Sequence, residues 1–69
     1  MSQAKEKIVV SAHADVDAAR CAIYAGDAAV EQGDVERARS AYQISLKIWE
    51  VLGRDTEIHL LQERLLGLS

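Results

Sequence analysis

The sequence predicts an all-α fold of three helices, and three observations support this. Residues with high intrinsic helix propensity, chiefly Ala, Leu, Glu, Arg, Gln and Lys, dominate the composition, and proline is absent. Apolar residues recur at steps of three or four along the second half of the chain. Gly33 and Gly53 stand where the periodic segments end. We therefore expect an antiparallel helical hairpin followed by a capping helix.

The first helix is expected to end near Gln32, because Gly33 suits the left-handed conformation just past a helix end. Two starts are compatible with the sequence: one near Asp15, and one near Ala4 with the helix unbroken from there. The β-branched run at residues 8–10 also suits an extended chain. We favour helix there, because no other segment could pair with a lone strand.

The second helix is expected from about Val35 to Leu52, with Asp34 as its N-cap. A helix that packs on one neighbour needs one apolar stripe, whereas this segment carries two and is expected to make contacts on two sides. The first stripe consists of Val35, Ala38, Tyr42, Ser45, Trp49 and Leu52, and the second of Ile44, Ile48 and Val51.

The third helix is expected from about Glu57 to Leu66, after the stop at Gly53, with Asp55 or Thr56 as its N-cap. One apolar row follows the helical period, and two further leucines lie off it. The row is Ile58, Leu61, Leu65 and Leu68, and the others are Leu60 and Leu66. The chain thus divides into residues 1–14 (an N-terminal extension or the start of the first helix), 15–52 (the hairpin) and 55–67 (the capping helix).

The segment 17–50 has 34 residues, the period of a tetratricopeptide repeat, and its second half resembles one. Gly26 and Ala38 stand at the small positions where the two helices of such a repeat cross. Tyr42 stands at the bulky aromatic position, and Gly33 at the turn. The resemblance is weaker in the first helix, where alanines replace larger residues. It implies a closely packed hairpin held by Gly26, Gly33, Ala38 and Tyr42.

One repeat cannot bury its own apolar face, and about three are usually needed. The resemblance therefore implies assembly, and we expect a homo-oligomer, with a two-fold dimer as the commonest form. A compact three-helix bundle that folds these side chains inward is the alternative. The candidate interface residues are Ile44, Ile48, Trp49, Val51, Leu60, Leu61 and Leu65.

Charge and hydropathy narrow the classes of partner. Eight basic residues are interleaved with eleven acidic ones, for a net charge of −3, whereas nucleic-acid binding needs a clustered basic face. No apolar run is long enough for a signal peptide or a membrane span. The single cysteine, Cys21, excludes an internal disulfide and fits a reducing compartment. We therefore expect a cytoplasmic protein with no nucleic-acid or membrane partner.

No catalytic, cofactor-binding or metal-binding residue is assigned. His13 and Asp17 are spaced to share a helix face, and His59 could add a third ligand, but a structural zinc site needs four. Cys21 lies among alanines, the setting of a small core residue rather than a nucleophile. The glycines lack the lysine and hydroxyl of a phosphate loop.

The expected function is a non-catalytic protein–protein interaction or assembly module that uses its apolar helix faces. Two alternatives stay open. The chain is a small accessory or regulatory subunit of a larger enzyme, or it is a helical dimer with a ligand site at its interface. In the last case His13, Asp17 and Cys21 are the expected participants.

Overall fold

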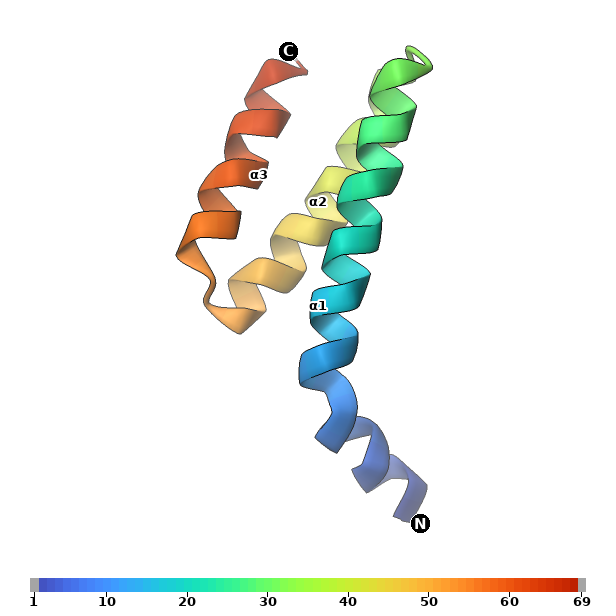
Figure 1. The fold of residues 1–69 in the computed structure, drawn as a ribbon, viewed down its shortest axis with the longest axis vertical. Coiled ribbons are helices and arrows are strands. Elements are labelled where there is room, and N and C mark those ends of the chain that lie inside the picture. The colour runs from blue at the N-terminus through green and yellow to red at the C-terminus, as the bar shows by residue number, and fades with distance from the viewer. Residues whose placement is uncertain (1, 69) are drawn as a thin grey trace.

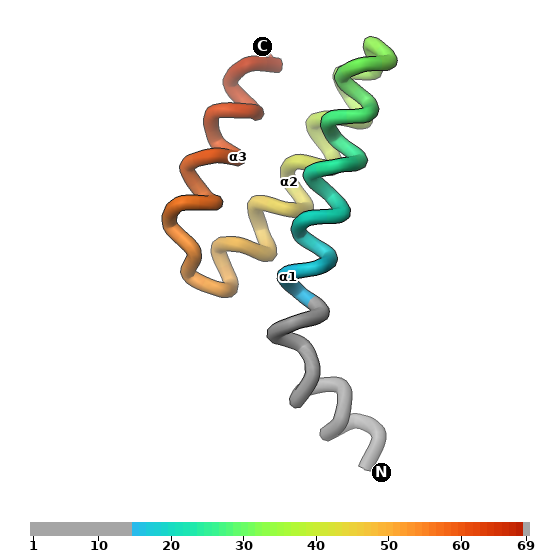
Figure 2. Tube along the Cα trace, in the orientation of Figure 1, coloured from blue at the N-terminus to red at the C-terminus, as the bar shows by residue number. Residues whose placement is uncertain are grey.

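The computed structural model describes residues 2–68 of the chain, with side chains from residue 15 onward. Three helices follow one another: α1 (Ser2–Glu31), α2 (Val35–Leu52) and α3 (Asp55–Gly67). The residues described form no strand. In Figure 1, α2 turns back antiparallel to α1, and α3 turns back again on the other side of α2. Figure 2 shows the same path as a tube, coloured from residue 15 onward. The expected all-α fold of three helices is confirmed.

The first turn follows from two adjacent residues. Gly33 has a φ of +80°, in the left-handed region where only glycine is unstrained. The Asp34 N–H then donates to the carbonyl of Ala29 at 2.8 Å, which satisfies one carbonyl at the end of α1. The Asp34 carboxylate accepts a hydrogen bond from the backbone N–H of Arg37 at 3.2 Å. Asp34 is thus the N-cap of α2, as predicted.

The second turn corrects one prediction. Gly53, with a φ of +69°, ends α2. The N-cap of α3 is Arg54, with no side-chain cap, rather than Asp55 or Thr56. The reason is the shortness of the turn, in which Arg54 alone separates Gly53 from the helix. Asp55 therefore lies inside the first turn of α3, where its negative charge interacts favourably with the helix dipole.

The core lies along α2, which packs against α1 on one side and α3 on the other. It combines three alanines with three large side chains: Ala19, Ala29, Ala38, Tyr42, Trp49 and Leu61. A buried serine, Ser45, joins α2 to α1, because its hydroxyl donates to the carbonyl of Ala19 at 2.9 Å. Small residues on α1 therefore let α2 approach closely and fill the space with its larger side chains.

The closest approach of α1 and α2 is at Gly26. A Cβ atom built there would lie within 2.6 Å of Cδ1 of Tyr42, so the tyrosine ring occupies the volume of a side chain at this position. Ala38, fully buried, lies one turn before Tyr42 on the same face of α2. Gly26, Ala38 and Tyr42 thus lie in the packed interior of the hairpin, and Gly33 makes its turn.

Gly26→Ala is expected to destabilise the protein by about 1–3 kcal/mol, because the added methyl group must displace the Tyr42 ring from a packed site. Urea denaturation followed by circular dichroism measures the change. Gly67→Ala is the matched control, since a Cβ there meets no atom within 4 Å. Equal stability of Gly26→Ala and the parent chain would contradict this packing.

Candidate functional site

One polar cluster connects all three helices. The Tyr42 hydroxyl on α2 donates a hydrogen bond to Oδ1 of Asp27 on α1. The other carboxylate oxygen of Asp27, Oδ2, lies 3.5 Å from Nη2 of Arg64 on α3. The Arg64 guanidinium carbon also lies 5.8 Å from the centre of the Tyr42 ring, within the range of a cation–π interaction. We call these three residues the Tyr42–Asp27–Arg64 cluster.

The cluster stabilises the protonated form of Tyr42. Burial, first of all, and then the hydrogen bond to Asp27 and the negative charge of that carboxylate raise the pKa of its phenol from the ordinary 10.0 to about 12. The positive charge of Arg64 acts in the opposite direction. At neutral pH the phenol therefore keeps its proton and donates a hydrogen bond to the Asp27 carboxylate. The cluster holds helices together, and its geometry is that of a structural link.

Arg64 matters because α1 and α3 do not pack directly against each other within the described residues. α3 contacts α2 through Leu61, which is fully buried. The ion pair between Arg64 and Asp27 adds a polar connection from α3 to α1. Both side chains remain partly exposed, at 34% and 43%, so solvent weakens this ion pair.

The predicted interface residues divide into three groups. Ile44, Val51 and Leu60 are exposed, and Ile48 and Leu65 are partly buried against the core. Trp49 and Leu61 lie inside the core of the single chain, so they present no surface to a partner. Trp49 of α2 and Leu61 of α3 both belong to the core cluster, because each lies on the face of its own helix that packs against a neighbouring helix.

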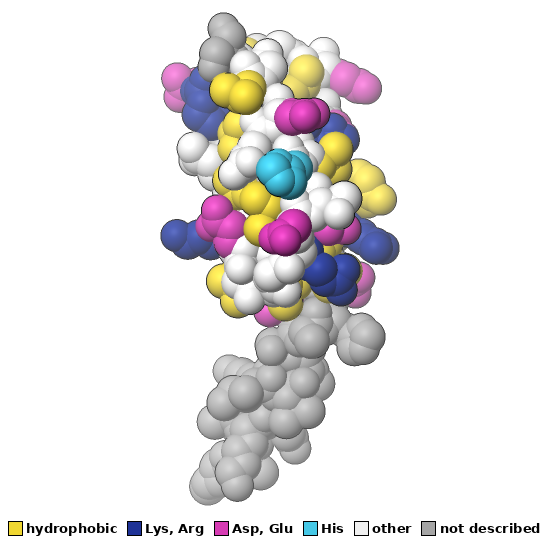
Figure 3. Space-filling view, turned by 90° about the vertical axis from the view of Figure 1, so that its left-hand side faces the viewer, with side chains coloured by type: hydrophobic (Ala, Val, Ile, Leu, Met, Phe, Trp, Pro, Cys, Tyr) yellow, Lys and Arg dark blue, Asp and Glu magenta, His cyan; other side chains and the backbone are white. Residues whose placement is uncertain are grey.

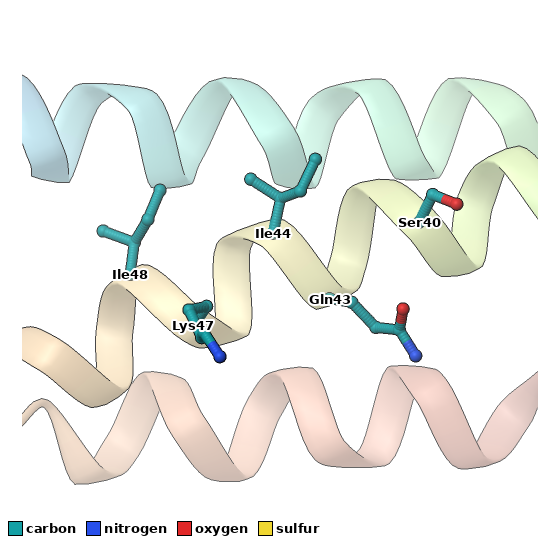
Figure 4. Close-up of a pocket in the computed structure, with 5 residues that line it drawn as sticks. All are labelled: Ser40, Gln43, Ile44, Lys47 and Ile48. Atoms are coloured by element: carbon teal, nitrogen blue, oxygen red, sulfur yellow. The ribbon is translucent and has the colours of Figure 1, made fainter.

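A shallow groove of about 650 Å³ runs along the outer face of α2. Five residues line it: Ser40, Gln43, Ile44, Lys47 and Ile48. In Figure 4, Ile44 and Ile48 point to one side of α2, and Gln43 and Lys47 to the other. The groove thus has an apolar edge and a polar edge. We call it the α2 groove.

The described side chains offer little for metal or covalent chemistry. Among residues 15–68, no three His, Cys, Asp or Glu side chains gather closely enough to hold a metal ion. His13 lies outside the described side chains. Cys21 is exposed rather than in the core, because two residues from the buried Ala19 it points to the opposite side of α1. Nor does any helix in the described part have the length and apolarity to cross a bilayer.

Sequence reasoning missed three residues that the structure makes prominent. Asp27 and Arg64 form the link between α1 and α3, yet they are separated by 36 intervening residues and share no motif. Tyr24 is exposed on α1. Leu66, which the helical period already places off the row that contains Leu61, is exposed on α3.

No known protein family, characterised protein or solved structure matches this chain.

The stability of the folded chain is expected to fall between about pH 10 and pH 12. In that range the unfolded chain loses the Tyr42 phenolic proton while the folded chain retains it, so unfolding is favoured as the pH rises. The contribution is fully present below pH 10 and amounts to roughly 2–3 kcal/mol. Urea denaturation at several alkaline pH values measures it.

Tyr42→Phe is the control, because it keeps the ring and removes the titrating group. Its stability is expected to fall less steeply over the same range, since only the ionisable groups common to both proteins still titrate. Parallel curves for the two proteins would show that Asp27 and burial do not hold the proton on Tyr42.

Proposed function

We propose that this chain is a non-catalytic protein–protein interaction or assembly module that works through the apolar faces of its helices in the cytoplasm. The observation that carries the proposal is the set of large apolar side chains left in solvent. Val51 is 77% exposed, Leu66 75%, Tyr24 68% and Ile44 58%. They come from all three helices, in a chain of 69 residues. Its partner is another protein or a second copy of itself.

The energetic reason is the size of the hydrophobic effect. Burying a Val, Leu or Ile side chain completely contributes about 1.5–3 kcal/mol relative to leaving it exposed. A small domain has only a few kcal/mol of net stability. The free energy gained by burying several such side chains is therefore as large as the net free energy of folding. Contact with a partner supplies that burial.

The hairpin packing supports a repeat-like architecture. Gly26 on α1 receives the Tyr42 ring of α2, and α3 packs on the far side of α2. This is the arrangement expected if α1 and α2 are one tetratricopeptide-like unit and α3 is the helix that caps it. A single unit leaves stacking surfaces open, because each unit in such a protein is covered by its neighbours.

The compact three-helix bundle explains the burial of some of the apolar side chains but not the exposure of others. It accounts for Trp49 and Leu61, which are buried within the single chain. It does not account for Ile44 and Val51, which stay exposed after all three helices have packed. These two residues belong to the second stripe of α2, of which only Ile48 packs against the core of the single chain.

The double variant Val51→Gln/Leu66→Gln is expected to weaken association with a partner by about tenfold or more while leaving the fold intact. Both side chains are largely exposed, at 77% and 75%, so the change mainly removes surface available to a partner rather than core. Sedimentation velocity over a wide concentration range measures self-association. Capture of proteins by the immobilised chain tests binding to others.

The exposed polar position Thr56 provides a matched control, Thr56→Gln, which adds the same side chain outside the apolar surface. Circular dichroism verifies that all variants are folded. A parent chain that is monomeric at every concentration and captures no protein would overturn the proposed function.

A further inference from the structure

The α2 groove is an apolar surface with a positive charge. Ile44 and Ile48 provide its apolar edge, and Lys47 is the only charged residue that lines it. The two ion pairs among the described side chains are Arg37 with Asp34 and Arg64 with Asp27, so neither uses Lys47. Val51, one turn after Lys47, continues the apolar edge and is exposed. The groove therefore suits a helix face that combines apolar side chains with a carboxylate.

The outer face of α3 has that composition. Leu60, Glu63 and Leu66 follow one another at steps of three, so they form a row on one side of the helix. All three are exposed, and Glu63, between the two leucines, makes no ion pair among the described residues. Figure 3 looks onto the α3 side of the molecule, where hydrophobic and acidic side chains lie next to one another. We call these three residues the α3 outer row.

We propose that the α2 groove binds the α3 outer row of a second copy of this chain, with Glu63 of one copy paired with Lys47 of the other. This proposal depends on the proposed function and names the partner and the surfaces. The two surfaces carry opposite charges, Lys47 in the groove and Glu63 in the row, and each charge lies beside apolar side chains. Charge complementarity of this kind selects a partner and its orientation.

The two surfaces have similar lengths. The groove runs from Ser40 to Ile48, about 12 Å at 1.5 Å per residue, and the α3 outer row covers about 9 Å. Each surface is about two helical turns long, so one helix can lie along the other. Leu60 and Leu66 then contact the isoleucines while Glu63 reaches Lys47.

A single chain cannot make this contact with itself. α3 already packs on α2 through its inner row, Ile58, Leu61, Leu65 and Leu68. The α3 outer row points away from that contact. The groove and the row are therefore both open on the same molecule.

Pairing like surfaces is less favourable. A groove facing a groove brings two Lys47 side chains onto a surface with no carboxylate, and two α3 outer rows bring Glu63 toward Glu63. The favourable contact joins different surfaces, so two copies held by one such contact leave one groove and one row free, whereas a two-fold arrangement pairs both grooves with both rows. In either case we expect self-association that depends on concentration.

Charge reversal tests the pairing of Lys47 with Glu63. Lys47→Glu and Glu63→Lys are each expected to raise the apparent dissociation constant for self-association about tenfold at low salt, because each places like charges across the contact. An equimolar mixture of the two variants is expected to associate nearly as well as the parent chain, because every contact between unlike variants pairs opposite charges. Sedimentation velocity on the full chain, on each variant and on the mixture gives the comparison.

Two further variants carry the same charge changes outside both surfaces. Arg20→Glu and Glu31→Lys alter exposed residues of α1, and both are expected to associate as the parent chain does. Recovery in the mixture supports the proposal. Single variants that associate like the parent, or a mixture no better than its components, would overturn it while leaving an interaction role through other surfaces in place. A parent chain that stays monomeric also overturns it, and the capture experiment then decides the proposed function separately.

Discussion

The close contact between Gly26 and the Tyr42 ring is the constraint on which the rest of the structure depends. Because position 26 has no side chain, the tyrosine ring can lie against the backbone of α1. That position brings its hydroxyl to Asp27, and Asp27 in turn pairs with Arg64 of α3. The contact that sets the spacing of α1 and α2 thus also positions the carboxylate that pairs with α3. In a core with three alanines, few other contacts are large enough to do this.

The small core also explains why so much apolar surface stays outside. The three large buried side chains, Tyr42, Trp49 and Leu61, fill the spaces between α2 and its two neighbouring helices. A helix has more than one face, however, and among the described residues α2 packs against two neighbours, α1 and α3. The face with Ile44 and Val51 is left uncovered, as is the outer face of α3. The same shortage of neighbours that limits the stability of the fold therefore creates its surfaces for association.

Much of the helical architecture could be predicted from the sequence, because the signals are local. Val35–Leu52 was expected as the second helix, and the structure has the same bounds, since Asp34 and Gly53 act within one turn of their own positions. The N-cap of α3 was missed because two polar candidates follow Gly53 and local chemistry does not choose between them and Arg54. The pair Asp27 and Arg64 could not be predicted, because their contact requires α3 to be placed first.

The sequence by itself determined the three helices, their turns and the existence of two apolar stripes on α2, since helical period and turn chemistry depend on neighbouring residues. Only the tertiary structure decided which apolar side chains are buried. Trp49 and Ile44 lie on the same helix and are both strongly apolar, yet one is in the core and the other in solvent. The difference arises because burial depends on the direction from which another helix arrives, and that direction is set by packing between segments far apart in the chain.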